Sequence, residues 1–442
     1  MWGEPLVRRY KVIKKKLILI LLLLHWGQKG FCQGDFTRIY HPIINEAELA
    51  IVDTNYYEAL DFYKEAFANV RNPFAKDYYN AAICAAMAGK LPLTLEYLEK
   101  IVEKGYPSDS LRKDIFIHYV ADTCKRWTAF EKQMKLVKPN INWELRDSLK
   151  SYYTLVTKVV HTPLTPELRA FFNESFKKRQ DILTVAGKKE VFTQVIFPDS
   201  LYYFGDFPKN LRIQQDSLKK INYAKYAVNS KIAFQKTLGL IEMNGFPDET
   251  LIGLSGFDGR FTKVYRNALL YEQSLNISVF DKNLTINLLS SSLSTQGQEI
   301  LPVLIQAIRD GKLIPHQINR INFSKLDTNT KNLENELRYA IMGRVQTLQL
   351  QLEANLVCKN SAGIENKKFW KKEPLSNYSE AEINEKRTDI GLEKLADAYK
   401  KAFFKANPTP FIINGGSYQK ELSYISSCEV LEKVLKENVL LR

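Results

Sequence analysis

The chain has 442 residues, of which 45% are hydrophobic and 25% are charged, so it can bury a globular core without disulfides or metals. Its formal net charge is +14, but residues 1–33 hold seven Lys and Arg against one acid, and without them the charge is +8. The remaining basic residues are dispersed, whereas nucleic-acid binding proteins cluster them on one element, so we expect no nucleic-acid partner.

The first 34 residues have the layout of a secretory signal peptide. A basic block ends at Lys16, and an unbroken run of Leu and Ile follows at 17–24. Three small residues close the segment: Gly30, Cys32 and Gly34. Charge, a short apolar helix and small residues, in that order, are what a signal peptidase substrate requires. The sequence therefore predicts a signal peptide at 1–34 and a periplasmic or secreted protein.

Two alternatives to cleavage keep the chain at a membrane. A retained anchor would use residues 17–26, but these supply half of the roughly 20 apolar residues that cross a bilayer. A lipid on Cys32 would normally follow small residues, whereas Lys29 and Phe31 lie nearby. We therefore favour cleavage, before Gln33 or Asp35, and expect membrane contact only if the leader is retained.

Four cysteines remain beyond the leader: Cys84, Cys124, Cys358 and Cys428. An even number in an oxidising compartment permits two disulfides, but the spacing assigns no pairing. Cys84 lies in the Ala-rich segment AAICAAMAG, so we expect a small buried thiol there.

Residues 43–105 contain two related helical hairpins. The segment NEAELAIVDTNYYEALDFYKEAF, from Asn45, aligns at a shift of 35 residues with NAAICAAMAGKLPLTLEYLEKIV, from Asn80. Small residues recur where helices approach closely, and large ones where they fill grooves. A period near 34 resembles the tetratricopeptide repeat. Because such stacks normally need about three repeats, we expect the helices that follow to cover the end of this pair.

Six tyrosines on these helices are the candidate binding residues: Tyr56, Tyr57, Tyr63, Tyr78, Tyr79 and Tyr97. Paired helices present a concave wall, and tyrosines on it supply a large contact area to a peptide or partner helix. The alternative is that they pack between the repeats.

Further helices are expected at 109–137 and 143–160, completing a helical domain over 35–160. The segment HTPLTP at 161–166 breaks the helical pattern and marks the boundary to a second domain at 167–442. We therefore predict two domains behind the leader.

The second domain is expected to be mostly helical with a small β element. Two β-branched and aromatic runs at 182–206 predict a short hairpin. The helices expected here lie at about 210–243, 297–310, 330–357, 379–405 and 419–440. Ser379 and Glu382 have the spacing of a capping box. The predicted fold class is mainly α: tetratricopeptide-like hairpins followed by an α-rich α+β domain.

Sequence signatures of catalysis are absent from the chain: it has no G-x-S-x-G elbow, Walker loop or dinucleotide fingerprint. Beyond the leader, His41, His118, His161 and His316 have no second histidine within five residues, so the helical zinc pattern is missing. We expect His118 to be packed in an apolar helix, and His41 and His161 to lie at the surface. No catalytic residue, metal or cofactor is predicted.

Four segments resemble a group of uncharacterised exported bacterial proteins with a tetratricopeptide-like N-terminal segment and a helical domain of unknown function. They are NAAICAAMAGKLPLTLEYLEKIVEKGY at 80–106, GFPDETLIGL at 245–254, LPVLIQAIRDGKL at 301–313 and INEKRTDIGLEKL at 383–395. In that group a Gln-His pair precedes the LPVL-type helix and an Asp-Arg pair follows it. Here SSSLSTQGQ and Asn319–Arg320 stand in their places, so the resemblance transfers no catalytic residue.

The sequence favours a non-catalytic protein-binding or scaffold module of the cell envelope. The alternative is an envelope hydrolase or sugar-binding enzyme with its site in residues 210–400. That alternative requires an Asp or Glu beside His316 or Arg320 in a concave pocket.

Overall fold

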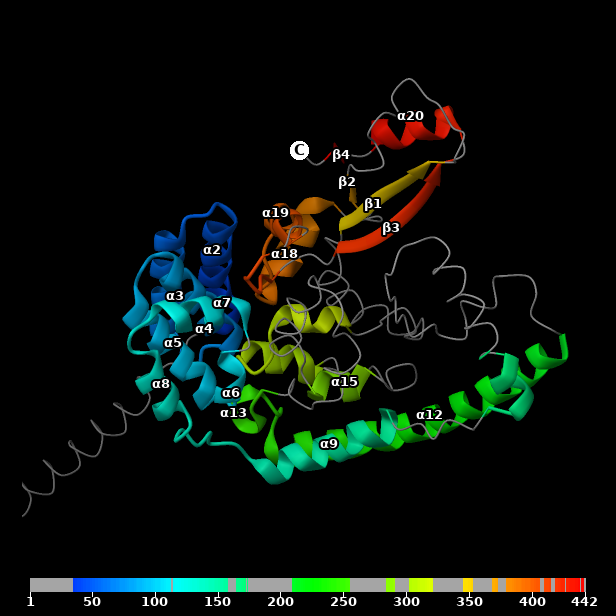
Figure 1. Cartoon of the computed structure of the whole chain (residues 1–442), viewed down its shortest axis with the longest axis horizontal. Helices are drawn as coiled ribbons and strands as arrows, with labels where there is room; N and C mark the ends of the chain where they lie inside the picture. Colours follow the sequence, from blue (N-terminus) through cyan, green and yellow to red (C-terminus); the bar gives the residue numbers. More distant parts are fainter. Residues whose placement is uncertain are drawn as a thin grey trace, which may run out of the picture.

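The computed structural model describes residues 35–112, 114–157, 164–171, 173, 209–254, 284–290, 302–320, 345–352, 368–372, 379–405, 409–414, 418–425, 427–437 and 439–440. The described chain is mainly helical (Figure 1). The hairpin expected at 182–206 and the boundary at 161–166 fall largely or wholly outside these residues, so both stay predictions.

The N-terminal part consists of paired helices, as expected for 43–105. A short π-helix precedes them, and the elements are η1 (Phe36–Tyr40), α2 (His41–Val52), α3 (Tyr56–Asn69), α4 (Ala75–Met87) and α5 (Leu91–Glu103). α2 packs against α3, and α4 against α5. The Asn55 side chain accepts the Glu58 N–H and caps α3, while Gly89 adopts φ +70° before α5.

The next helices cover the end of this layer. They are α6 (Ser108–Leu111), α7 (Ile115–Thr123) and α8 (Trp127–Met134). α7 packs on α4, and α8 on α5. Helix is predicted over 109–137, and within that range Asp114 starts a separate helix because its Oδ1 accepts the N–H groups of Phe116 and Ile117.

A long helical pair lies beside this layer (Figure 1). It consists of α9 (Trp143–Thr157) and the 36-residue α12 (Lys209–Asn244), and the short helices α13 (Glu249–Ile252) and α15 (Leu284–Ser290) accompany it. α15 packs against both long helices. The helix expected at about 210–243 is confirmed, and it ends where Gly245 takes φ +75°.

The remaining elements include a four-stranded sheet with strand order β3-β1-β2-β4. Its strands are β1 (Val345–Leu352), β2 (Lys368–Lys372), β3 (Tyr418–Ile425) and β4 (Val439–Leu440). β1 pairs parallel with β3 and antiparallel with β2, and β2 pairs antiparallel with β4. The helical predictions for 345–352 and 419–425 are therefore wrong. Polar and apolar residues alternate in VQTLQLQL, which is the two-residue period of a β-strand. β1 is hydrogen-bonded to a neighbouring strand on both of its edges.

The last helices are η2 (Pro315–Arg320), a 3₁₀ helix, and α18 (Glu380–Asp389), α19 (Leu395–Lys405) and α20 (Cys428–Glu437). The predicted capping box at the start of α18 is confirmed: Ser379 Oγ accepts the Glu382 N–H, and the Glu382 carboxylate accepts the Ser379 N–H. Helix is confirmed over Glu380–Asp389, Leu395–Lys405 and Cys428–Glu437, parts of the stretches expected at 379–405 and 419–440.

The largest core cluster joins the N-terminal helices to the C-terminal part of the chain. It runs from Phe36 to Met134 and also contains Leu254, Ile314 and residues 411–413. α19 packs directly on α2. Segments more than 250 residues apart in sequence therefore share one interior.

Four buried charges lie at the contact of α2, α4 and α19. Lys76 Nζ lies 2.7 Å from Glu48 Oε1 and 2.7 Å from Asp77 Oδ1, and Lys401 Nζ lies 2.7 Å from Glu48 Oε2. All four side chains are at most 2% exposed. Two positive and two negative groups balance, which is the condition for tolerating ionised groups in an interior.

The cysteines differ in state. Cys84 and Cys124 are free and buried, and Cys428 is disulfide-bonded. The expectation of a small buried thiol at Cys84 is confirmed, and burial raises the pKa of this thiol.

Gly311 is expected to resist substitution because the Phe36 ring lies against it. Its φ is +67°, and a Cβ at this position would overlap the Phe36 ring. Gly311→Ala should lower the free energy of unfolding by about 2 kcal/mol, combining a left-handed backbone with overpacking. Gly89 is the control: its φ is +70°, but a Cβ there meets nothing within 4 Å, so Gly89→Ala should cost about half as much. If urea unfolding gave the same loss of stability for both variants, contact with Phe36 would not be the reason that Gly311 resists substitution.

Candidate functional site

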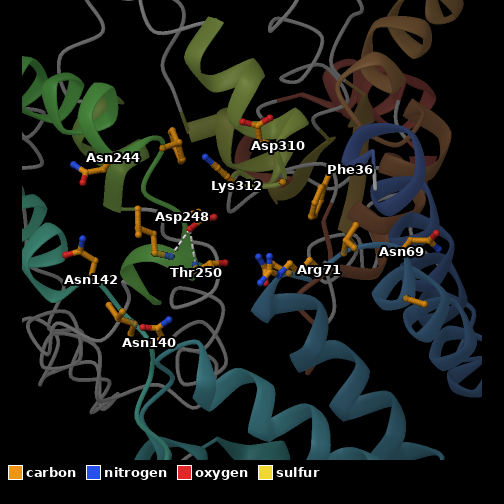
Figure 2. A pocket seen from close by; sticks show the side chains of 17 residues that line it. Phe36, Asn69, Arg71, Asn140, Asn142, Asn244, Asp248, Thr250, Asp310 and Lys312 are labelled. Carbon is orange, nitrogen blue, oxygen red and sulfur yellow. Dashed lines mark hydrogen bonds between the residues drawn. The ribbon is translucent and has the colours of Figure 1, made fainter. Parts of the chain in front are cut away.

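The candidate site is a cleft of about 1190 Å³ between the N-terminal helices and the residues that connect α12 to α13 (Figure 2). Its walls come from the loop after α3, the residues before α9, the chain from the end of α12 through α13, and the turn at 310–312. The polar and charged lining residues are Asn69, Arg71, Asn72, Asn140, Asn142, Asn244, Asp248, Thr250, Asp310 and Lys312. Phe36 and Phe246 contribute apolar surface.

The amide side chains lie in the cleft because helices end and begin there. Asn69 and Asn244 close α3 and α12, and each donates a side-chain N–H to the carbonyl four residues earlier, at 2.8 and 3.0 Å. Asn142 precedes α9, where its Oδ1 accepts the Leu145 N–H at 2.9 Å. Helix ends favour Asn because its short amide satisfies terminal backbone groups. Convergence of these ends makes the walls polar.

Both signs of charge are present in the cleft. Asp248 Oδ1 accepts the N–H groups of Thr250 and Leu251 at 3.1 and 2.8 Å, and burial raises the pKa of this carboxyl. The Asp310 carboxylate accepts a Gln306 N–H at 2.7 Å. Both carboxylates thus accept hydrogen bonds from groups of the protein itself. Within the described ranges, Arg71 and Lys312 form no ion pair, and the charge of Lys312 acts against burial by lowering the pKa of Asp248.

A second polar cluster surrounds Glu393, in the turn between α18 and α19. The Glu393 carboxylate lies 2.9 Å from His316 Nε2 and 3.3 Å from Arg387 Nη2, and Arg387 Nε donates to the Glu393 carbonyl at 2.7 Å. Burial alone would raise the pKa of Glu393, but the charges of His316 and Lys401 hold it well below its usual value.

His316 thus has the acidic neighbour that the enzyme alternative requires. Its side chain is only 14% exposed, however, and Nδ1, the nitrogen not paired with Glu393, is enclosed without a hydrogen-bond partner. His316 also does not line the cleft. The ion pair links the 3₁₀ helix η2 to the turn between α18 and α19. The side chain of Arg320 is not among those that the structure describes.

The six candidate tyrosines do not meet in the cleft. Tyr63, Tyr79 and Tyr97 are buried, Tyr56 and Tyr78 are partly buried, and Tyr57 is exposed. The Tyr78 ring lies 4.5 Å from that of Phe67, the Tyr56 ring stacks on Phe411, and the Tyr79 hydroxyl donates to Asp114 at 2.9 Å. The packing alternative therefore accounts for most of these residues.

The inner face of α2 and α4 is covered by the chain itself. The Asn80 amide donates to the Ile412 carbonyl and accepts the Ile412 N–H, both at 2.9 Å. The Asn414 N–H donates to Glu48 at 3.0 Å. The helices thus bind backbone groups of Ile412 and Asn414 of their own chain, where a free concave wall was expected.

Two predictions for histidines are wrong. His41 is buried, with its ring stacked at 5.9 Å on that of Phe74, because the aromatic core begins at Phe36. His118 is 55% exposed and lies 3.3 Å from Asp122, since α7 turns this face to solvent. His161 lies outside the described residues.

Comparison with known proteins adds no functional assignment. No protein-family model, curated protein or solved structure matches this chain significantly. In the described part of the chain, no group of three or more His, Cys, Asp and Glu side chains is placed to hold a metal ion. Among the same residues no helix has the length and apolarity that spanning a membrane requires.

The sequence indicates the helix ends that line the cleft, but it does not indicate that these ends come together. Asn72–Pro73 and Asn244–Gly245 are typical helix stops, and both positions line or adjoin the cleft. Stop signals give the ends of helices along the chain. They do not indicate which ends meet in space.

Proposed function

We propose that this protein is a non-catalytic binding module of the cell envelope that receives a polar, extended segment of a protein partner in the cleft. The cleft carries the proposal. Its volume of about 1190 Å³ is slightly above the roughly 300–1,000 Å³ of small-molecule pockets, which favours a ligand of several linked units.

The chemistry of the walls favours a peptide. Asn side chains offer a donor and an acceptor, the pair of groups that a peptide backbone repeats along its length. Asn80 forms this pair with Ile412 inside the protein, at 2.9 Å for both bonds. Arg71 and Lys312 add positive charge for an acidic side chain or a carboxylate terminus.

Two further parts of the proposal come from the sequence. Helix pairs α2–α3 and α4–α5, related by a 35-residue shift, support a tetratricopeptide-like arrangement, followed by an α-rich domain with a small sheet. Export through residues 1–34 agrees with the disulfide at Cys428, since disulfides persist in oxidising compartments.

Photo-crosslinking in cells tests the cleft. A benzophenone amino acid at Asn72, on the exposed rim, should give discrete adducts with an envelope protein. The same group at Leu136, which is 80% exposed and lies outside the cleft, should give none. Arg71→Glu with Lys312→Glu should reduce the Asn72 adducts about tenfold, because reversed charges repel an acidic ligand. Absence of adducts, identical adducts at both positions, or no response to charge reversal would contradict the proposal.

A further inference from the structure

We propose that Arg71 determines which peptide segments the cleft accepts, by binding one carboxylate of the ligand, and that Lys312 does not share this role. The assignment rests on the peptide-binding function proposed for the cleft, and it defines the ligand as a segment that brings one carboxylate to Arg71. Arg71 and Lys312 are the two cationic side chains among the described lining residues. Arg71 comes from the loop after α3 and Lys312 from the turn at 310–312, on different walls of the cleft (Figure 2).

Lys312 shares its wall with acidic groups of the protein. Asp310 is two residues before it in the same turn, and both residues line the cleft. The charge of Lys312 also lowers the pKa of the Asp248 carboxyl against the effect of burial, so these two side chains interact electrostatically. A ligand carboxylate that approaches Lys312 therefore meets repulsion from carboxylates on the same wall.

Arg71 has neutral neighbours on its own wall. The other polar lining residues of the loop at 69–72 are Asn69 and Asn72. The Arg71 side chain is exposed and, in the described part of the chain, forms no ion pair. Its planar guanidinium can donate two parallel hydrogen bonds to one carboxylate, whereas a lysine ammonium acts as a point charge. The wall at 69–72 is therefore the part of the cleft that attracts an anionic group.

The loop between α3 and α4, which carries this guanidinium, is fixed at both ends. Val70 and Phe74 are 7% and 3% exposed and belong to the largest core cluster. The Ala75 N–H, at the start of α4, donates to Glu249 Oε1 at 2.7 Å. Lys104 lies 3.0 Å from the same oxygen, so this nearby acid has its own cation. A loop held in this way orders few additional groups when a ligand binds.

Asn69 supplies a second contact on the same wall. Its Nδ2 donates to the Glu65 carbonyl at 2.8 Å, so its Oδ1 is the atom left to accept a hydrogen bond from a ligand. In a peptide, the carboxylate of an acidic side chain and that of the carboxyl terminus both lie close to a backbone N–H. One cation with one acceptor on its wall therefore suits a peptide carboxylate from either source.

Affinity selection from peptide pools tests this assignment. Random hexapeptides are incubated with the chain from residue 35 onward, which contains every described element, and the retained peptides are identified by mass spectrometry. One pool ends in a free carboxylate and the other in an amide. Peptides retained from the amide pool should carry Asp or Glu, and replacing that residue by Asn or Gln should weaken binding about tenfold. If only the free-carboxylate pool gives binders, and amidation weakens them about tenfold, the terminus is the source of the carboxylate.

Substitution of each cation then separates their roles. Arg71→Gln should abolish the difference in affinity between the acid and amide forms of a retained peptide. Lys312→Gln should keep that difference, whatever its effect on overall affinity. Arg126→Gln is the control, because Arg126 is exposed and lies outside the cleft. Circular dichroism establishes that each variant is folded.

The outcomes distinguish this assignment from peptide binding itself. Retained peptides that bind equally well in acid and amide form overturn the role of Arg71 and leave peptide binding intact. The same holds if Arg71→Gln keeps the difference or if Lys312→Gln abolishes it. Retention of no peptide from either pool contradicts peptide binding in the cleft, and the role of Arg71 with it.

Discussion

Lys401→Met is expected to reduce the free energy of unfolding by about 3–5 kcal/mol, the usual cost of removing one partner from a buried ion pair. Lys401 Nζ lies 2.7 Å from Glu48 Oε2, and both side chains are at most 1% exposed. Methionine keeps the length and packing of the lysine stem. The loss therefore measures the charge interaction, and equilibrium urea unfolding gives its size.

The physical reason is the charge left behind. Burial would raise the pKa of Glu48, but the charges of Lys401 and Lys76 lower it to about 2, so Glu48 is ionised at neutral pH. Without Lys401, the buried group of Glu48, Lys76 and Asp77 carries a net negative charge. Apart from Lys401 and Lys76, no cation among the described residues pairs with Glu48. Its remaining partners are Lys76 and the Asn414 N–H.

A second substitution separates charge from packing. Adding Glu48→Gln to Lys401→Met leaves Lys76 paired with Asp77 and restores neutrality, so the double variant should recover at least 1 kcal/mol of the loss. Lys400→Met is the control, because Lys400 forms an exposed pair with Asp53 at 2.7 Å and should change stability by less than about 0.5 kcal/mol. A double variant less stable than Lys401→Met would refute the charge explanation.

This ion pair shows where prediction from sequence ends. Helical periodicity and stop signals predicted α12 and the two hairpins, because those patterns are local. Lys401 and Glu48 are 353 residues apart, and each has the sequence context of an ordinary exposed helix residue. Only the packing of α19 on α2 makes them partners.

The errors have the same origin. Residues 345–352 lie within the helix predicted at 330–357, but backbone pairing with β2 and β3 makes them a strand. The sequence offers the tyrosines both as binding residues and as packing residues, and it does not show that Ile412 and Asn414 bond to Asn80 and Glu48 on the same helices. The amides at the helix ends were predictable as turn residues, but the cleft they form was not.

Acid is expected to destabilise the protein through His41, beginning near pH 6.5. Burial, together with the nearby charges of His316 and Lys76, lowers the pKa of His41 to about 3, while Glu48 and Glu393 act in the opposite direction. In the unfolded chain the pKa returns to about 6.5, so the unfolded state binds the proton first. Stability is therefore complete above pH 6.5 and falls by up to about 1.4 kcal/mol per unit as the pH drops toward 3.

His41→Asn isolates this contribution. Between pH 6.5 and 4.5 the wild type should lose roughly 2–3 kcal/mol more than the variant, measured by urea unfolding at each pH. Glu48 does not contribute in this window, because its pKa of about 2 in the fold and 4.5 as the ordinary value places its loss at lower pH. His118→Asn, at a ring that is 55% exposed, should keep the wild-type pH dependence. If His41→Asn and the wild type lose stability in parallel through this window, His41 takes up its proton inside the folded core and its enclosure does not oppose protonation.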